Sequence, residues 1–194
     1  KMKKLFFIGL FALSSQLIAQ DESTEKEKIC WSDSVAIEWT DFQAPAEEGK
    51  KIAALSSIGL PYKYITDGEG EMNVSVDVCF IKGESWYIKS QKNNLLLNHE
   101  RLHFDIAELY RRKIIREIVK TEFTKKNYKA KLDKIVEKYW VDEYRKAQNL
   151  YDKETNFSRV VKAQIEWNEK IAKELKELQA YQQKVLEVSL INFD

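Results

Sequence analysis

The chain has little glycine, little proline and no excess of charge of either sign. Its 194 residues include 6 glycines and 2 prolines, which excludes collagen-like and glycine-rich architectures. Lysine and arginine number 32 against 31 aspartates and glutamates, so nothing in the net charge would attract the protein to nucleic acid or to an anionic membrane. Apolar residue types make up 44% of the chain, which is enough for the core of one folded domain.

Hydrophobic runs are also short. The apolar run at residues 5–13 is shorter than the roughly 20 residues needed to span a bilayer, and it follows three lysines. A basic start, a short apolar stretch and a small polar end at Ala19 and Gln20 are typical of a secretory signal peptide. We therefore expect a signal peptide at 1–20, a charged linker at 21–28 and one domain at 29–194. The protein would be exported, periplasmic or extracellular, with no stable membrane span after signal removal; an uncleaved anchor is the alternative.

Cysteine is scarce, with only Cys30 and Cys79 in the chain. An exported protein enters an oxidising compartment, in which two cysteines can form a disulfide. We predict a bridge between them, and two buried free thiols are the alternative, because the sequence does not give their distance in space. Metal binding by both is disfavoured, since they lack a close Cys-x-x-Cys spacing.

Two kinds of periodicity divide the expected domain. Between residues 29 and 87 the sequence favours strands at 35–39, 52–58, 62–66 and 72–80, with a glycine-containing turn at 67–70. From Asn93 or Asn94 apolar residues recur at three- and four-residue steps, which predicts a helix to about Lys120. Two further helices are expected at 126–150 and 158–188. The fold class is therefore α+β, with an N-terminal antiparallel β-sheet packed on the first helix, followed by a long helical pair.

Both histidines of the chain lie in this first helix, in one pentapeptide of the pattern H-E-x-x-H. Four helical steps place His99 and His103 about 40° apart and one turn from each other, so both can bind one zinc ion. Glu100 lies beside them, where it can take a proton from zinc-bound water and return it to a leaving amine. The alternative is a pair of histidines held by hydrogen bonds in the core.

Segments around this motif resemble a family of bacterial domains of unknown function that are described, from the motif, as secreted zinc-dependent proteases. The resemblance extends over most of the expected domain and is carried by segments spread along it: 37–42, 53–57, 85–86, 97–110, 151–156 and 164–167. The resemblance implies zinc as the cofactor, His99 and His103 as its ligands, and Glu100 as the general base. It also implies a peptide or protein substrate.

The chain departs from this family where a third ligand is expected. After the pattern Tyr-Asp-x-Glu-Thr-x the family usually has a histidine, and here the position is Phe157. Because the chain has no third histidine, the remaining ligand is a carboxylate, a water molecule or absent. Asp152 and Glu154 are the nearest carboxylates. We predict Glu154, which lies about one helical turn before Phe157; a solvated position at a helix start is its alternative.

Two more carboxylates follow the motif in the first helix. Asp105 and Glu108 do not share the face of His103, so neither is expected to bind the metal. Glu108 is expected to be a solvated helix charge. Asp105 either orients a ligand or caps a neighbouring loop.

These observations favour a zinc-dependent metallopeptidase, in which zinc-activated water hydrolyses peptide bonds and Glu100 is the general base. By analogy with zinc proteases of this kind, a substrate strand is expected to add to a sheet edge near residues 71–80. A non-catalytic zinc-binding or envelope protein, which lost its third ligand at Phe157, is one alternative. A structural envelope protein that contacts partners through its lysine- and glutamate-rich helices is another.

Overall fold

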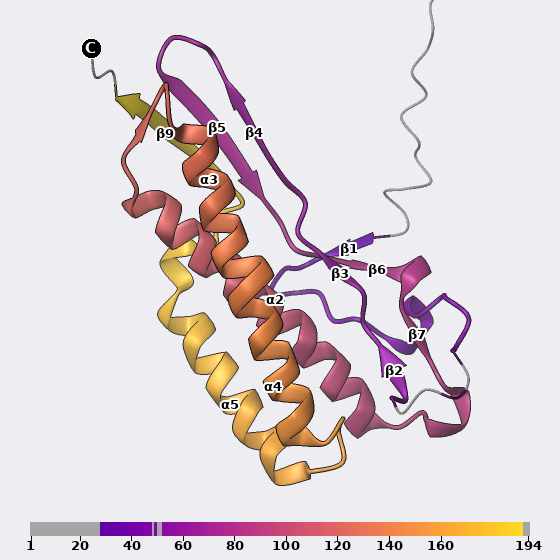
Figure 1. Ribbon diagram of the computed structural model, residues 1–194. Coiled ribbons are helices and arrows are strands. Elements are labelled where there is room, and N and C mark those ends of the chain that lie inside the picture. The colour runs from indigo at the N-terminus through magenta and orange to yellow at the C-terminus, as the bar shows by residue number, and fades with distance from the viewer. Residues whose placement is uncertain (1–27, 48, 50–51, 192–194) are drawn as a thin grey trace, which may run out of the picture.

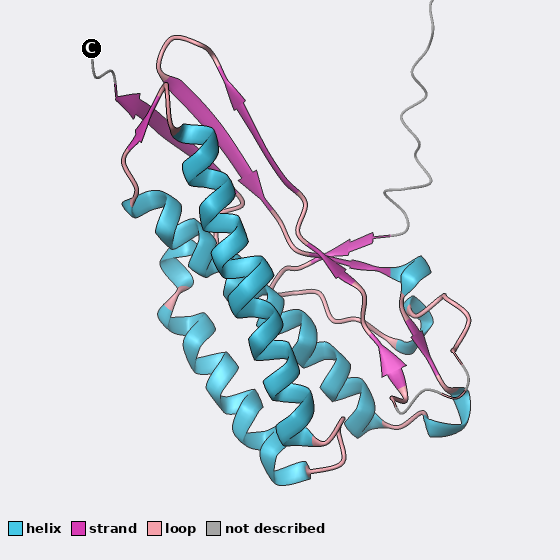
Figure 2. Ribbon diagram, viewed as in Figure 1, coloured by secondary structure: helices cyan, strands magenta, loops and turns pink. Residues whose placement is uncertain are grey.

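The computed structural model describes residues 28–47, 49 and 52–191 (Figure 1). The expected signal peptide at 1–20 and all but the last residue of the linker lie outside them. The strands come mainly from the N-terminal half and the helices from the C-terminal half, which confirms the α+β class (Figure 2). Among the described residues, none of the helices has the length and apolar character that crossing a membrane requires.

The strands form three small sheets. Their bounds are β1 (Lys28–Cys30), β2 (Ala54–Leu55), β3 (Ile58–Gly59), β4 (Tyr62–Thr66), β5 (Glu71–Val76), β6 (Cys79–Ile81), β7 (Trp86–Tyr87), β8 (Phe123–Thr124) and β9 (Val185–Ile191). The strand orders are β1-β6-β3, β2-β7 and β4-β5-β9-β8. Every pair is antiparallel except β8 with β9.

The helices pack together in the C-terminal half. They are α2 (Asn94–Lys120), α3 (Tyr128–Val136), a π-helical segment (Glu137–Tyr144), α4 (Arg145–Thr155) and α5 (Val161–Glu177), with short 3-10 helices at Trp39–Asp41, Lys82–Glu84, Lys89–Gln91 and Gln179–Tyr181. The side-chain oxygen of Asn93 accepts a hydrogen bond from the Leu96 N–H at 2.9 Å, so α2 begins at the predicted cap. The second predicted helix is confirmed as a continuous helical path from α3 to α4, which ends five residues later than expected.

Helix α2 contributes to every large apolar cluster of the described chain. Leu96 and Phe104 pack with the N-terminal strands, Ile114 and Ile115 pack under the β4-β5-β9-β8 sheet, and Leu102 packs against α5. The packing of an N-terminal sheet on this helix is therefore as predicted. Because it is held on several sides, α2 is a rigid base for the side chains of the H-E-x-x-H motif.

The predicted hairpin is confirmed. β4 and β5 pair from Tyr62 with Val76 to Thr66 with Met72, and the carboxylate of Asp67 accepts three backbone N–H groups in the turn. Gly68 has a φ of 79°, a conformation that favours glycine. The alternating residues of 72–80 are buried as expected, but they serve two cores, because the strand breaks between β5 and β6.

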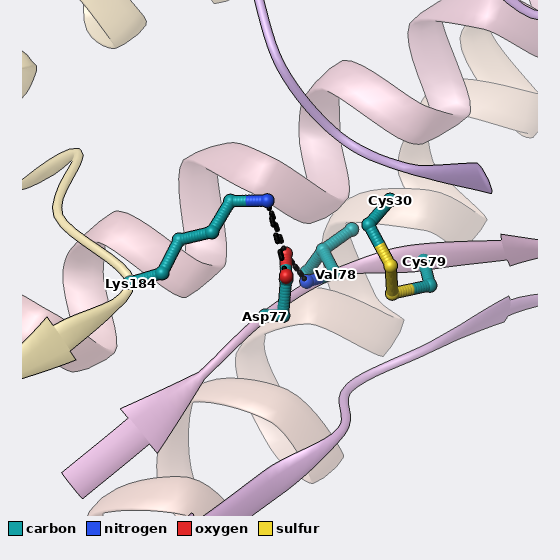
Figure 3. The surroundings of a disulfide bond; sticks show 5 residues. All are labelled: Cys30, Asp77, Val78, Cys79 and Lys184. Carbon is teal, nitrogen blue, oxygen red and sulfur yellow. Dashed lines mark hydrogen bonds and ion pairs between the residues drawn. A yellow bond between two sulfur atoms is a disulfide. The ribbon is translucent and has the colours of Figure 1, made fainter. Parts of the chain in front are cut away.

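Cys30 and Cys79 form the predicted disulfide (Figure 3). They are directly opposite each other on β1 and β6. Next to the bridge, Asp77 forms an ion pair with Lys184 at 2.9 Å and accepts the N–H of Val78 (Figure 3). These links hold the N-terminal strand and the segment before β9 at the point where β5 ends.

Two of the predicted elements are wrong. Residues 35–39 are not a strand but a loop that leads into a 3-10 helix, with the Ile37 carbonyl accepting from Arg101 Nε at 2.8 Å. The alternation there reflects a loop whose Ile37 and Trp39 side chains are buried. The third predicted helix ends at Glu177, and β9 follows, because Leu186 and Leu190 face the core at strand spacing.

Candidate metal centre

Helix α2 brings the two histidines of the motif together. Nε2 of His99 lies 3.1 Å from Nε2 of His103, and the two rings meet edge to face with planes at 84°. Glu100 is buried beside them, and one carboxylate oxygen and one nitrogen from each imidazole lie within 4.8 Å of one another. The helical spacing therefore places these three side chains in one spot, as the sequence predicts.

A carboxylate from α4 joins the histidine pair. Oδ1 of Asp152 lies 3.1 Å from Nε2 of His99 and 3.1 Å from Nε2 of His103. The three atoms thus form a triangle with equal sides. Tetrahedral zinc with bonds of about 2.0–2.1 Å needs neighbouring ligand atoms about 3.3 Å apart. The triangle has close to this size, so its three atoms can face one metal ion.

Glu154, the predicted third ligand, is not brought to the histidines. It lies in the last turn of α4, and its Oε2 accepts a hydrogen bond from the indole Nε1 of Trp167 at 2.7 Å. The alternative expectation is met only in part, because Glu154 is exposed but lies at a helix end rather than a helix start. Residues two positions apart point about 200° apart on a helix, so Asp152 faces α2 while Glu154 faces α5.

Each imidazole is held at its other nitrogen by a glutamine. Nε2 of Gln148 donates to the His103 carbonyl at 3.0 Å, which turns Oε1 of the same amide toward His103 Nδ1, 2.5 Å away. Oε1 of Gln164 lies 3.2 Å from His99 Nδ1 and accepts the Tyr151 hydroxyl at 2.8 Å. An amide oxygen can only accept, so both Nδ1 atoms carry the proton. Both Nε2 atoms consequently present a lone pair.

The centre therefore contains three acceptors and no donor of its own. Two lone pairs and a carboxylate oxygen that face one another at 3.1 Å in a buried site require a cation or a proton between them. Without a metal ion a proton is held there. Burial opposes a charged His103, but the hydrogen bond to Asp152 and the charge of Glu100 outweigh it and raise the pKa of His103. Burial likewise opposes a charged Asp152, yet hydrogen bonding with the pair of His103 and His99, which holds this proton, lowers its pKa.

A pocket of about 310 Å³ opens over the centre. Its lining comes from β2 and its flanks, from α2, and from the helical path that ends in α4: Ile52, Ala53, Ala54, Leu55, Ser56, Leu96, His99, Glu100, His103, Tyr144, Arg145, Gln148, Asn149, Asp152 and Phe157. The Ser56 hydroxyl donates to Oε2 of Glu100 at 2.7 Å. This hydrogen bond holds one carboxylate oxygen of Glu100 in place, and the side chain faces the pocket.

The sheet edge at this pocket belongs to β2, not to residues 71–80. β5 is paired on one side with β4 and on the other with β9, so the expected site of strand addition there is wrong. In the described part of the chain β2 pairs only with β7. The Ile88 N–H donates to the Ala53 carbonyl, so by the alternation of an antiparallel pair the N–H and C=O of Ala54 point away from β7.

Phe157, the residue that replaces the expected histidine, forms part of the pocket wall. It lies in a run of three non-glycine residues with positive φ, Asn156 at 47°, Phe157 at 52° and Ser158 at 74°. Such conformations cost roughly 1–3 kcal/mol each and persist where surrounding structure fixes them. The Phe157 N–H donates to the carbonyl of Asp152 at 3.0 Å, which ties this segment to the metal centre.

The two carboxylates further along α2 have structural partners. Asp105 accepts a hydrogen bond from Trp31 Nε1 at 2.8 Å and so holds the segment after β1, rather than orienting a metal ligand. Glu108 is completely buried between Arg111 and Arg112, so the expectation of a solvated charge is wrong.

Sequence reasoning did not find Ser56, Gln148 or Gln164. Ser56 and Gln164 lie in segments that resemble the family, but nothing in those segments assigns them a place at the motif, because each reaches it from a distant element. Gln148 does carry a local signal: together with Tyr144 and Asp152 it recurs at four-residue steps, which places all three on one helical face. If this face packs against the helix that carries the motif, Asp152 rather than Glu154 is the carboxylate that joins the histidines.

Residues 86–158 match a family described as bacterial protein of unknown function (DUF922). No curated protein and no solved structure matches the chain. The matched segment runs from β7 to just beyond α4 and includes the motif, Gln148, Asp152 and Phe157. In the part that carries the candidate metal centre, the chain is therefore similar to a bacterial domain of unknown function.

Proposed function

We propose that this protein is an exported zinc-dependent peptidase. The observation that carries the proposal is the triangle of His99, His103 and Asp152, whose three acceptor atoms lie 3.1 Å apart and whose outer partners leave them no donor. Two imidazoles and one carboxylate form a ligand set that catalytic zinc uses, with a fourth position for water. When bound, zinc lowers the pKa of that water toward about 7 and polarises a carbonyl group.

Glu100 acts as the general base in this proposal. Its carboxylate faces the pocket, and the Ser56 hydroxyl holds Oε2 at 2.7 Å, which leaves Oε1 for a water molecule. Oε1 takes a proton from the attacking water and delivers it to the nitrogen of the leaving amine. Gln148 and Gln164 keep the imidazoles in the tautomer that offers Nε2.

The edge of β2 supplies a place for an extended substrate. Ala54 lines the pocket, and its backbone N–H and C=O point away from β7, so they are available to pair with a peptide. Main-chain pairing of this kind would hold a peptide beside Glu100. This favours peptides over small esters or sugars as substrates.

Export is supported by the disulfide. Bridges such as that between Cys30 and Cys79 persist in oxidising compartments and are rare in the cytosol. The proposal therefore places the peptidase in the periplasm or outside the cell.

One observation favours a second candidate, a zinc-binding protein without catalysis. Phe157 gives the pocket an apolar wall where the similar family usually has a histidine, so a polar group that could assist the reaction is missing there. The two candidates share the metal centre and differ only in turnover.

Two measurements on the purified protein test the proposal. Metal analysis is expected to give one zinc ion per chain in the wild type and to lose it in His103→Ala. Hydrolysis of a mixed pool of quenched fluorescent peptides is expected in the wild type and absent in Glu100→Gln, which retains its zinc. A wild type without zinc contradicts the metal centre, and zinc without any hydrolysis supports the second candidate.

A further inference from the structure

Arg145 is a charged residue of the pocket without a partner. Its side chain lines the pocket together with the metal centre and is exposed. Within the described residues it forms no hydrogen bond and no ion pair. Arg101, in contrast, binds the Ile37 carbonyl, and Arg111 binds Glu108. The guanidinium of Arg145 is therefore available to a ligand.

With a metal ion bound, the positive and negative charges that line the pocket do not cancel. Glu100 and Asp152 are the two carboxylates, and Arg145 is the one permanently cationic side chain of the lining. A divalent cation balances the two carboxylates, and the neutral histidines add nothing. The guanidinium then remains as an uncompensated positive charge in a pocket of about 310 Å³. A ligand that brings a negative group removes this imbalance.

The positions of the lining residues on α4 fit a carboxylate. Arg145, Asn149 and Asp152 follow one another at four and three residues, so they lie along one helical face, and all three line the pocket. A guanidinium binds a carboxylate through two parallel hydrogen bonds, and the Asn149 amide one turn away offers a further donor. Arg145 precedes Asp152 by seven residues, about 10 Å along the helix axis, which is the length of about three extended peptide residues.

We propose that Arg145 selects substrates with a carboxylate within about three residues of the cleaved peptide bond. This specificity rests on the proposed peptidase function and adds a substrate class to it. The carboxylate has two sources, the C-terminus of a short peptide and an aspartate or glutamate side chain. Phe157 and Leu55 supply apolar surface in the same pocket, which lowers the local dielectric and strengthens the pairing with the guanidinium.

The affinity for peptides, rather than their hydrolysis, is measured to test this inference. The zinc-loaded Glu100→Gln protein is mixed with three labelled peptides of otherwise identical sequence, and fluorescence anisotropy gives each Kd. One peptide is neutral, with a C-terminal amide and a glutamine; the second has a free C-terminal carboxylate; the third keeps the amide and replaces glutamine by glutamate. At least one acidic peptide is expected to bind about 10-fold more tightly than the neutral one. Which of them does so identifies the source of the carboxylate.

The variant Arg145→Gln, made in the Glu100→Gln protein, is expected to lose this preference and keep its zinc. Lys146→Gln is the matched control, because Lys146 is a neighbouring exposed cation that does not line the pocket. Equal affinity for all three peptides, no binding of any, or a preference that persists in Arg145→Gln would overturn the inference.

The same peptides separate this inference from the proposed function. If the wild type cleaves the neutral and acidic peptides equally well, the peptidase stands and the role of Arg145 falls. If acidic peptides bind tightly through Arg145 but none is cleaved, the role of Arg145 as a carboxylate site stands and the peptidase falls.

Discussion

Two clusters of polar side chains involve α2, a few residues apart: one is buried, the other is partly buried and includes a carboxylate from α4, and they differ in whether their charges and acceptors are matched. The arginine cluster consists of Glu108, Arg111 and Arg112. The carboxylate accepts from both guanidinium groups at 2.6–2.7 Å. Three further donor contacts go to the backbone carbonyls of Leu175, Gln182 and Gln183.

The histidine cluster consists of His99, His103 and Asp152. Its outward nitrogens are satisfied by glutamines, but its inward atoms are three acceptors that face one another. A pocket opens over this cluster.

Burial alone therefore does not distinguish a structural cluster from a binding site. Both clusters use the same helix and are mostly enclosed. In the arginine cluster every charge has a partner within the chain, and these partners fasten the segment before β9 to α2. In the histidine cluster the partners fix the side chains but leave a place for a cation. The count of unmatched acceptors, rather than exposure, marks the site.

The largest expected effect comes from removing the carboxylate of the arginine cluster. Glu108→Ala leaves two buried guanidinium groups without their carboxylate, and the free energy of unfolding is expected to fall by about 3–5 kcal/mol. Urea denaturation measures this loss. Glu108→Gln keeps hydrogen bonding without the charge and should fall between the wild type and the alanine variant. If Glu108→Ala lowers the free energy of unfolding by less than about 1 kcal/mol, the arginine cluster contributes little to the stability of the fold.

The next effect concerns the histidine cluster and Asp152, its proposed third zinc ligand. Asp152→Asn preserves shape but removes the charge, and zinc affinity measured by chelator competition is expected to fall by about 100-fold, or about 2.7 kcal/mol. Glu154→Gln, two residues away, is the matched control and should bind zinc like the wild type, because its carboxylate contacts Trp167. A larger loss in Glu154→Gln than in Asp152→Asn would restore Glu154 as the ligand.

A smaller effect is expected at the outer partners. Gln148→Leu removes the acceptor of His103 Nδ1, so zinc affinity should fall by about 10-fold while the metal stoichiometry stays the same. Gln148→Glu retains an acceptor for Nδ1 but loses the amide donor to the His103 carbonyl, so it should recover only part of the affinity. Equal zinc binding in Gln148→Leu and the wild type would mean that packing alone orients the ring.

The features of the fold that the sequence predicts are those set by interactions between residues close together in the chain. The start of α2 is a local feature, an asparagine cap before an apolar stripe, and the hairpin at 67–70 is a local glycine turn, so both were predicted. The helix expected at 158–188 runs into the first residues of β9, because lysines and glutamates precede this strand and its pairing with β5 comes from more than 100 residues away. The loop at 35–39 has the alternating apolar pattern of a strand because Ile37 and Trp39 point into the core.

The candidate site divides in the same way. His99, Glu100 and His103 are fixed relative to one another by helical spacing, so their meeting follows from the sequence. The choice between Asp152 and Glu154 depends on which face of α4 packs against α2, and the four-residue recurrence of Tyr144, Gln148 and Asp152 is the signal that favours Asp152. The π-helical segment Glu137–Tyr144 before α4 is not visible in the apolar pattern. Ser56 and Gln164 reach the site only through tertiary packing.

The smallest expected effect is at Asp105, a carboxylate that lies on α2 between the two clusters and accepts a hydrogen bond from Trp31. Burial raises the pKa of Asp105; the Trp31 bond opposes this, the charge of Glu108 adds to it and that of Arg112 opposes it. Because the folded pKa lies above the unfolded one, the protonated carboxyl stabilises the fold at low pH, and this contribution is lost as the pH rises through the folded pKa.

Asp105→Asn cannot ionise and keeps an oxygen for the Trp31 N–H. The variant should therefore unfold like the wild type at a pH below the ordinary pKa of an aspartate, and become the more stable of the two as the pH rises to 7. Because the Trp31 hydrogen bond is kept in both proteins, the difference comes only from the ionisation of Asp105 in the wild type and is expected to be the smallest of these effects. Urea denaturation at several pH values measures it. A variant less stable than the wild type at pH 7 would mean that the charge of Asp105 is needed by Arg112, and that the arginine cluster extends further along α2 than its three residues.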